Sequence, residues 1–537
     1  MVNVSSPAML PYMGRPLIYQ TIVNHIRHHS ADVMVAVPHA DTTLQDFLIS
    51  TFGARVNLTL VPIHASLRGT PATSLGAAVA AAIERNMGER PAYIVHGDTY
   101  FEPAAPLKHE RPVIYVDDYV SSEKYSYLVE DGTGYRHHGA RPDAAEDAGG
   151  PGAGRRFTDI GAYWVPSLGD VAGAGADEAG DGKVGEVLTQ RYAGQVELAK
   201  VKVWSDLGHL DTATQIRTRL IGARAFNKLV VDEDRGLITK SSQASRKIVN
   251  EVGYYQNLPH PLSIYFPRLF DFSLSTPASY TMEYYSYRTL AEYFVFFRFP
   301  LSVWKKLIHK LIAIQREFAR YQGPSPTTIQ VERFYLGKLH SRMGELDPES
   351  AIGELARSDF VGLNGQSIQG WRHYLPLMEA TVKRIASAPR TSIIHGDLCF
   401  SNILYDPQTG LLRLIDPRGD FYEEGCFGDP RYDLAKLLHS VHGGYDFIMQ
   451  EMYDLHEEAP DNYRLKLFRS DDAAAMVQSL IADLGEQLPY EMDDLITLEA
   501  MLFLSMLPLH GDDERRQTAM YLTGISILNE VFGADLR

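Results

Sequence analysis

Two patterns of apolar and polar positions divide the chain. Up to about residue 215, short apolar runs typical of strands alternate with stretches of helical periodicity, which predicts an α/β domain with a mostly parallel sheet. The strand-like runs are DVMVAVP from Asp32, VNLTLVPI from Val56, AYIVHGD from Ala92 and PVIYVDD from Pro112, whereas SLGAAVAAAIERN from Ser74 is typical of a helix.

The pattern changes after Asp206. The runs NKLVVDED and GLITKSS lie on either side of a turn and predict a β-hairpin, KIVNEVGYYQNL predicts a helix, and YTMEYYSY predicts another strand. From Leu290 onward, helix-period segments rich in Leu, Ile and aromatic residues dominate. We therefore expect an α/β domain over residues 1–215, a small β-rich lobe over 222–290 and a larger helical lobe over 291–537.

Composition narrows the classes of partner. The formal net charge of -16 disfavours binding to a nucleic-acid backbone, so small molecules are the expected partners. The two cysteines, Cys399 and Cys426, are too few for a disulfide framework. The first residues lack the pattern of a signal peptide, and no apolar run is long enough to cross a bilayer. These features predict a cytoplasmic protein without a membrane partner, and they leave open whether it forms homo-oligomers.

The segment SIIHGDLCFSNILYDPQTGLLRLIDPRGDF, from Ser392 to Phe421, contains the clearest chemistry. Phosphoryl transfer needs a carboxylate at the acceptor hydroxyl, for which Asp397 is the candidate. It also needs oxygen ligands for Mg²⁺, and Asn402 and Asp416 are suitable. The runs NILY and LRLID predict a hairpin that brings these two ligands to one end, whereas an ordinary surface hairpin would explain the segment only if order, spacing and flanking strands all coincided by chance.

Two neighbouring residues are expected to have structural roles. His395 would hold the loop in shape through hydrogen bonds without taking part in the chemistry. In GDPRYDLAKLLHSV, Asp433 is expected to open a helix, because an aspartate carboxylate accepts the unpaired N–H groups of a first turn.

The motifs HGDLCFSN and LIDPRG resemble those of the aminoglycoside phosphotransferase and choline kinase family, whose fold is similar to that of protein kinases. HGD stands where protein kinases carry HRD, and IDPRG stands where they carry DFG. The resemblance implies a protein-kinase-like α+β fold with two lobes and the use of ATP and Mg²⁺. It also implies a small acceptor, namely a sugar, a polyol or an amino alcohol, rather than a protein.

The same resemblance implies further residues that bind ATP. The family needs a lysine on a strand of the small lobe and a helix glutamate that positions it, and Lys240 and Glu251 match in order and in element type. Lys247 competes as the partner of Glu251. In YTMEYYSY, which resembles the strand that connects the lobes, backbone groups near Glu283 and Tyr284 would contact the adenine, although a core strand with aromatic packing fits this run equally well.

The N-terminal part resembles nucleotidyltransferases of the sugar-phosphate and phosphocholine type, which have a Rossmann-like α/β fold. The similar segments are MLPYMGRPLIYQTI, LRGTPATSLGAAV, YIVHGDTYF, DIGAYWVP and VWSDLGHLDTA. Asp98 and Asp206 match the two aspartates that hold Mg²⁺ in that family, and CTP or UTP would be the substrate. The chain departs from the pattern because it lacks the Gly-rich loop and has Ser-Pro-Ala where a lysine is expected.

Three hypotheses follow. The first is a bifunctional enzyme that phosphorylates a metabolite and then activates it for a surface glycan such as capsular polysaccharide. The second is a kinase whose degenerate N-terminal domain regulates the kinase or mediates oligomerisation. The third is a noncatalytic scaffold. Acceptor contacts would come from the helical lobe, where the aromatic candidates are Trp304, Tyr335, Trp371 and Tyr374. A sugar or polyol is slightly favoured over an amino alcohol.

Overall fold

The computed structural model describes residues 3–4, 7–12, 15–26, 32–39, 41–53, 55–63, 82, 84–85, 88–97, 99–103, 109–118, 125–140, 154–171, 184–206, 228–243, 245–469 and 471–533. The chain divides into two compact units, Val4–Arg217 and Thr218–Arg537, the latter joined by Met1–Asn3. None of the described helices combines the length and the apolar character that crossing a membrane requires.

The N-terminal unit contains a mixed sheet with short helices. Its strands follow the order β10-β9-β11-β8-β12-β7, and β6 pairs with β11. The elements over this part of the chain are β1 Asn3–Val4, η1 Pro7–Met9, β2 Pro11–Tyr12, β3 Arg15–Pro16, α1 Leu17–Ile26, β4 Asp32–Pro38, α2 Thr42–Phe52, β5 Asn57–Ile63, β6 Ala92–Val95, β7 Thr99–Pro103, β8 Val113–Asp118, β9 Tyr127–Glu130, β10 Tyr135–His138, β11 Arg156–Val165, η2 Leu168–Val171, α4 Val184–Arg191 and β12 Glu197–Asp206.

The pairing of these strands corrects the expectation of a mostly parallel sheet. Among the described strands of this unit, β4 with β5 and β8 with β12 are parallel, and the other pairs are antiparallel. The hairpin of β9 and β10 shows why: residues 131–134, Asp-Gly-Thr-Gly, form its turn, and Gly132 there has a φ of 82°, which favours glycine. The predicted strands themselves are present as β4, β5, β6 and β8, whereas most of the helix expected from Ser74 lies outside the described residues.

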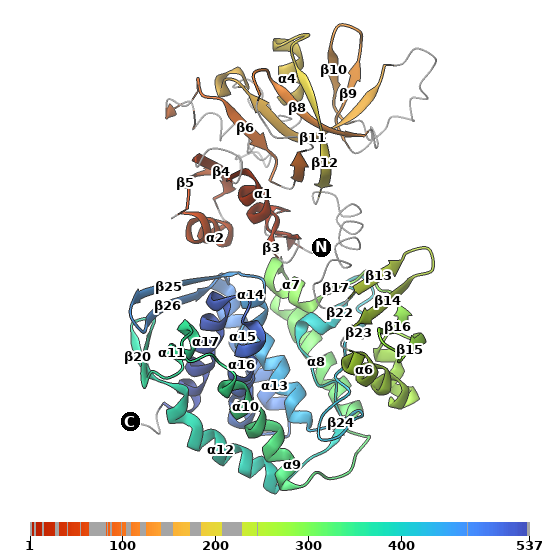
Figure 1. Cartoon of the computed structure of the whole chain (residues 1–537), viewed down its shortest axis with the longest axis vertical. Coiled ribbons are helices and arrows are strands. Elements are labelled where there is room, and N and C mark those ends of the chain that lie inside the picture. Colours follow the sequence, from red (N-terminus) through yellow and green to blue (C-terminus); the bar gives the residue numbers. More distant parts are fainter. Residues whose placement is uncertain are drawn as a thin grey trace. The chain divides into compact units, whose positions relative to one another are not determined.

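The C-terminal unit begins with a small lobe. Its four-stranded antiparallel sheet has the order β13-β14-β16-β15, and α6 packs against it (Figure 1). The bounds are β13 Lys228–Asp232, β14 Leu237–Ser242, α6 Ser245–Asn257, η4 His260–Tyr265, β15 Leu269–Ser273 and β16 Ala278–Glu283. In β14 and β16 every second residue is buried, and the hydrophobic ones among them pack on Ile248 and Val252 of α6. The predicted hairpin, helix and following strand are confirmed as β13, β14, α6 and β16.

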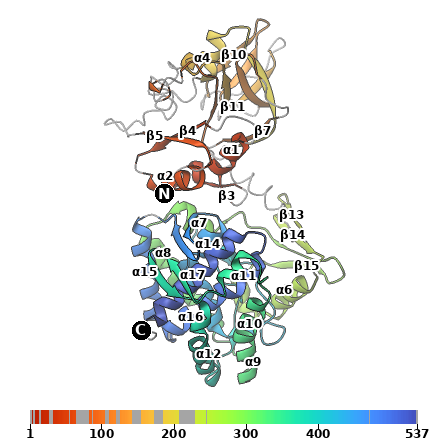
Figure 2. The same cartoon turned by 60° about the vertical axis from the view of Figure 1, so that its left-hand side comes forward.

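A larger helical lobe follows. In Figures 1 and 2 the helices α10, α12, α16 and α17 gather apart from the small-lobe sheet, and Figure 1 shows α13 among them. The elements are β17 Arg288–Thr289, α7 Leu290–Phe296, β18 Phe297–Arg298, α8 Leu301–Phe318, α9 Thr328–Glu332, η5 Arg333–Gly337, α10 Lys338–Gly344, α11 Ala351–Leu355, β19 Phe360–Leu363, β20 Gln366–Gln369, α12 Trp371–Ser387, β21 Ser392–Ile393, η6 Phe400–Asn402, β22 Ile403–Tyr405, β23 Leu412–Leu414, β24 Phe427–Gly428, α13 Pro430–Val441, α14 Tyr445–Met449, β25 Tyr453–Ala459, β26 Asn462–Leu467, α15 Asp471–Gln487, α16 Met492–Met506, η7 Leu507–His510 and α17 Glu514–Phe532.

Two of the described sheets of this helical lobe bear on the predictions from sequence. The antiparallel pair β22 and β23 is the hairpin expected on either side of Asp-Pro-Gln-Thr-Gly, with Ile403 opposite Leu414. The sheet β20-β19-β26-β25 was not expected, because its strands are short and its central pair, β19 with β26, joins segments about a hundred residues apart. Both α13 and α16 are buried along nearly their whole length and pack against each other.

Candidate active site

Asp397 and Asn402 lie together in the loop between β21 and β22. The side-chain amide of Asn402 donates hydrogen bonds to the Asp397 carboxylate, at 2.9 Å to Oδ2, and to the Asp397 carbonyl oxygen, also at 2.9 Å. Because its NH₂ group is directed at Asp397, the amide oxygen of Asn402 is the atom with which it can bind a cation. The Asp397 side chain is 41% exposed, so a substrate hydroxyl can reach it.

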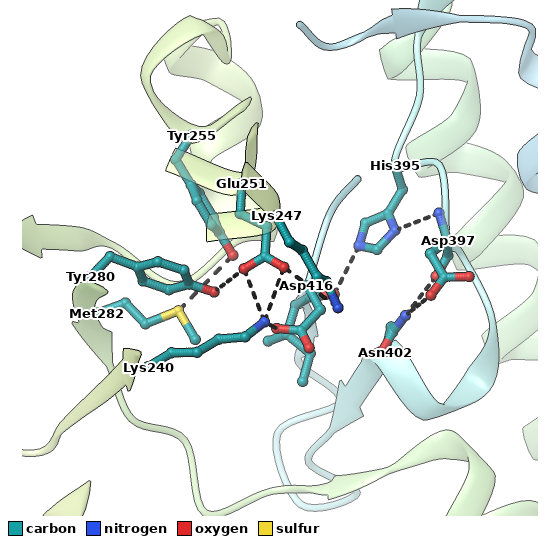
Figure 3. A network of polar contacts seen from close by, with 11 residues as sticks. Lys240, Lys247, Glu251, Tyr255, Tyr280, Met282, His395, Asp397, Asn402 and Asp416 are labelled. Atoms are coloured by element: carbon teal, nitrogen blue, oxygen red, sulfur yellow. Dashed lines mark hydrogen bonds and ion pairs between the residues drawn. The ribbon is translucent and has the colours of Figure 1, made fainter. Parts of the chain in front are cut away.

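Asp416 directly follows the strand β23 and Ile415. Its φ of 56° lies in the left-handed region, which aspartate tolerates better than most residues with a Cβ. The carboxylate accepts a hydrogen bond from Lys240 Nζ at 2.9 Å. Asp416 therefore connects the helical lobe to the small lobe, and Figure 3 shows it between the Lys240 group and the Asp397 group.

Lys240 and Glu251 form a buried ion pair. Lys240 Nζ lies 3.1 Å from Oε1 and 2.9 Å from Oε2 of Glu251, and the Tyr280 hydroxyl donates to the same carboxylate at 2.8 Å. Burial alone would lower the pKa of Lys240, but Asp416 and Glu251 outweigh it and raise that pKa, so the amine stays charged. Lys247, the competing residue, is 64% exposed and lies 3.8 Å from Glu251. Of the two lysines, Lys240 thus lies closer to Glu251. The role of Lys240 in binding ATP stays a prediction.

His395 holds the loop in the expected way. Its Nδ1 accepts the Asp397 N–H at 3.2 Å, so the proton is on Nε2, which donates to the Ile415 carbonyl oxygen at 3.0 Å. Burial lowers the pKa of His395 to about 4, which keeps the ring neutral near pH 7. The imidazole therefore ties the Asp397 loop to the strand that precedes Asp416.

Asp433 has a different place from the one expected. The residue that caps α13 is Asp429, whose side chain accepts the Arg431 N–H, and Pro430 occupies the first helical position. Asp433, one turn further on and buried, accepts the N–H groups of His395 and Gly396 at 2.7 Å each and the Gln315 amide at 3.0 Å. It therefore holds the backbone just before Asp397.

Sequence reasoning missed Lys436. Its Nζ lies 2.9 Å from Asp397 Oδ1. Burial opposes ionisation of Asp397, but the Lys436 ammonium prevails and holds the pKa of this carboxyl well below its usual value. A signal was available, because a lysine within the apolar helix run DLAKLLHSV has to find a partner when it is buried.

The residues predicted to contact the adenine and the acceptor already make contacts within the protein. The N–H groups of Glu283 and Tyr284 donate to Arg268 O and Gly236 O, so these two amides are already engaged within the small lobe. The four aromatic acceptor candidates are all buried in the helical lobe: Trp304, Tyr335, Trp371 and Tyr374. Trp304 stacks on Phe400, and the Trp371 indole N–H donates to the Ala356 carbonyl oxygen, as is typical of core residues.

In the N-terminal unit, only one of the two candidate metal ligands can be placed. Asp98 lies outside the described residues. Asp206 ends β12 and pairs with Thr99 of β7, the residue after Asp98. The strand register therefore sets Asp206 opposite the first residue of β7.

Comparison with known proteins identifies the C-terminal part. Residues 227–468 match the model of the phosphotransferase enzyme family, a range that begins just before β13 and ends after β26. No curated protein matches the chain.

Several solved structures are similar to this chain at low identity. An aminoglycoside-3'-phosphotransferase of type VIII shares 17% identity, with 60% of this chain and 100% of that chain covered and a TM-score of 0.28. A microcompartment-associated aminopropanol kinase shares 12%, with 57% and 89% covered and a TM-score of 0.36. Choline kinase from Cryptosporidium parvum Iowa II shares 12%, with 58% and 88% covered and a TM-score of 0.30.

Similarity at this level adds no argument to the family match. That match covers the strand of Lys240, the loop of Asp397 and Asn402, and Asp416. Residues 227–468 thus match the phosphotransferase enzyme family, and this match supports a protein-kinase-like phosphotransferase with a hydroxyl group as acceptor in this part of the chain.

Proposed function

We propose that residues 222–537 transfer the γ-phosphoryl group of ATP to a hydroxyl of a small sugar, polyol or amino alcohol. The observation that carries this proposal is the meeting of two groups from different lobes: Lys240 with Glu251, and Asp397 with Asn402, with Asp416 between them (Figure 3). A charged amine, a carboxylate for the acceptor and two oxygen ligands for a cation are the parts that phosphoryl transfer needs.

Each residue has a proposed task. Asp397, ionised through Lys436, accepts the proton of the acceptor hydroxyl while that oxygen bonds to the γ-phosphorus and the bond to the β-phosphate oxygen breaks, releasing ADP. Lys240 binds the phosphates, and Glu251 fixes its position.

Asn402 and Asp416 fit Mg²⁺, because an amide oxygen and a carboxylate are hard oxygen donors that this ion accepts together with phosphate oxygens and water. When bound, Mg²⁺ supplies neutralisation of the charge on the nucleotide phosphates. The carboxylate of Asp416 already faces a cation, the ammonium of Lys240, which is consistent with a position at the phosphates.

The N-terminal unit is a second candidate site, for nucleotidyl transfer with CTP or UTP. The position of Asp206 at the end of β12, opposite Thr99 of β7, supports it. In a bifunctional enzyme the phosphorylated metabolite would pass to this unit and become a precursor of a surface glycan. The alternative is a degenerate regulatory domain, since Ser-Pro-Ala stands where a lysine is expected.

A ³¹P NMR time course separates these hypotheses. The full chain is incubated with Mg²⁺, ATP, CTP and UTP and with pools of sugars, polyols and amino alcohols. A new phosphomonoester and ADP, absent with Asp397→Asn, support the kinase, and pyrophosphate with a diphosphodiester, absent with Asp206→Asn, supports the second activity. ATP binding without any transfer across all pools would favour the scaffold hypothesis.

A further inference from the structure

Three cationic side chains surround one tyrosine near Asp397. Tyr432 is buried on α13, and its hydroxyl oxygen lies 3.0 Å from Lys338 Nζ of α10 and 3.4 Å from Arg418 Nη1. Lys436, four residues after Tyr432, lies on the same face of the helix and contacts Asp397. We name Lys338, Arg418 and Tyr432 the cationic cluster.

The positive charge of this cluster is not balanced. Within the part of the chain that the structure describes, Lys338 and Arg418 make no ion pair with a carboxylate, and the carboxylate of Asp397 pairs with Lys436. Burial lowers the pKa of Lys338, and the charges of Arg418 and Lys436 add to this effect. Although burial opposes it, the surrounding cations lower the pKa of Tyr432 to about 8. Lys338 and Arg418 are each partly buried, and unpaired charge that is partly shielded from solvent is costly, so an anionic ligand would be stabilised here.

The backbone fixes this cluster beside the acceptor carboxylate. The Arg418 N–H donates to the His395 carbonyl oxygen at 2.8 Å. Gly396, the residue before Asp397, lies so close to Arg418 that a Cβ added to the glycine would be 2.9 Å from the Arg418 Cβ. Tyr432 and Lys436 are about one helical turn apart, roughly 5–6 Å. A molecule of a few carbons can therefore span from Asp397 to the cluster.

We infer that the acceptor alcohol carries an anionic group, a phosphate or a carboxylate, which Lys338 and Arg418 bind beside Tyr432 while the hydroxyl meets Asp397. This inference rests on the proposed kinase function and narrows its acceptor to phosphorylated alcohols and hydroxy acids. Lys338 and Tyr432 are on helices of the lobe that carries Asp397, whereas Lys240 and Glu251 are on the small lobe. This placement favours the acceptor over the nucleotide as the anion that the cluster binds.

The first experiment compares acceptors that share a three-carbon skeleton and differ in charge. The full chain with Mg²⁺ and ATP is given glycerol, 3-amino-1,2-propanediol, glycerate and glycerol 3-phosphate, and ADP release and phosphoester formation are measured. We expect kcat/KM at least about tenfold higher for the two anionic acceptors, since a hydrogen bond between charged groups is stronger than one between neutral groups. The two anionic arms distinguish a carboxylate from a phosphate. Turnover of the neutral or cationic acceptors without this preference would overturn the inference and leave the kinase function intact.

The second experiment uses Lys338→Met and a matched control, Arg342→Met. Arg342 is one turn further along α10, and its guanidinium is paired with Glu345 at 2.9 Å. We expect Lys338→Met to raise KM for the anionic acceptor at least about tenfold and to leave KM for ATP unchanged, with no comparable effect in Arg342→Met. A raised KM for ATP would instead assign the cluster to the nucleotide phosphates and overturn the inference.

Binding is measured in parallel, so that the result does not depend on turnover. Calorimetry with glycerol 3-phosphate or glycerate, in the presence of Mg²⁺ and a nonhydrolysable ATP analogue, should detect binding to the wild-type protein and to Arg342→Met and weaker binding to Lys338→Met. If neither anion binds to the wild-type protein, the inference is contradicted. Binding without turnover of any alcohol would contradict the kinase function instead.

Discussion

At Lys240, one buried amine lies between two carboxylates. The ion pair with Glu251 is made in an environment that excludes water, and the contact with Asp416 reaches the other lobe. In such surroundings the attraction between unlike charges is stronger than at the surface, and loss of either partner leaves a buried charge uncompensated. A single side chain here therefore affects both the site and the stability of the small lobe.

Replacing Lys240 by Met should lower kcat/KM for ATP by about 10²–10³-fold, the usual loss when one fixed donor to developing charge is removed. The matched control is Lys247→Met, because this lysine faces the same glutamate at 3.8 Å but is itself exposed, so that solvent screens its charge. Steady-state kinetics with the identified acceptor, together with thermal unfolding of each variant, provides the measurement. Equal losses of kcat/KM in the two variants would contradict the proposed role of Lys240.

At the scale of elements, α13 supports the loop that contains Asp397. It begins with Asp429 as its cap, presents Asp433 to the backbone of His395 and Gly396, and brings Lys436 to Asp397. One helix thus sets both the position and the charge of the proposed catalytic carboxylate.

This arrangement predicts that Asp433→Asn lowers kcat by about 10–10²-fold through misplacement of Asp397, with KM for ATP nearly unchanged. The substitution replaces one acceptor oxygen by an NH₂ group, so one of the two backbone N–H groups loses its partner, at a cost of about 1–3 kcal/mol in stability. Asp429→Asn is the control, because asparagine still caps a helix. It should destabilise through Arg431, its buried ion partner, and leave kcat intact. If kcat fell to the same extent in both variants, the hypothesis that Asp433 positions the Asp397 loop would be wrong.

The elements also show what the sequence could and could not predict. The runs NILY and LRLID on either side of a turn indicated a hairpin because the two strands are close in sequence, and β22 and β23 confirm it. The cap of α13 could have been read correctly, since proline at the first helical position identifies the residue before it as the cap.

Other features depend on the approach of distant segments. Lys338 and Tyr432 are 94 residues apart, and the pairing of β19 with β26 joins segments at a similar separation, so no local pattern indicates either. The antiparallel pairs of the N-terminal unit do not follow from the alternation of strands and helices, which is typical of parallel crossovers, because hairpin turns such as residues 131–134 join neighbouring strands directly.

At the scale of the whole chain, three helices of the C-terminal unit meet at His442. Its Nδ1 lies 2.9 Å from Glu499 of α16 and its Nε2 lies 3.2 Å from Glu530 of α17, while the residue itself ends α13. Burial alone would lower the pKa of His442, but the two glutamates outweigh it and raise the pKa to about 10. The charged imidazole thus stabilises the fold.

The sign of the pH dependence follows from this shift. The folded pKa lies above the unfolded value of 6.5, so the stabilisation is complete below pH 6.5 and is lost as pH rises through about 10. We expect His442→Gln to lower the melting temperature most near pH 6 and progressively less toward pH 10. Thermal unfolding of both proteins at pH 6, 8 and 10 checks this, and a difference independent of pH would refute it.

The central claim is that Asp397 serves the acceptor while Lys240, Asn402 and Asp416 serve Mg²⁺ and ATP. The most direct measurement is a paired determination of Mg²⁺–ATP affinity, by calorimetry, and of phosphoryl transfer to the acceptor, by ³¹P NMR, for the wild-type protein and Asp397→Asn. We predict unchanged affinity within about threefold and transfer slowed by about 10²–10⁴-fold. Transfer by Asp397→Asn at the wild-type rate would contradict the account.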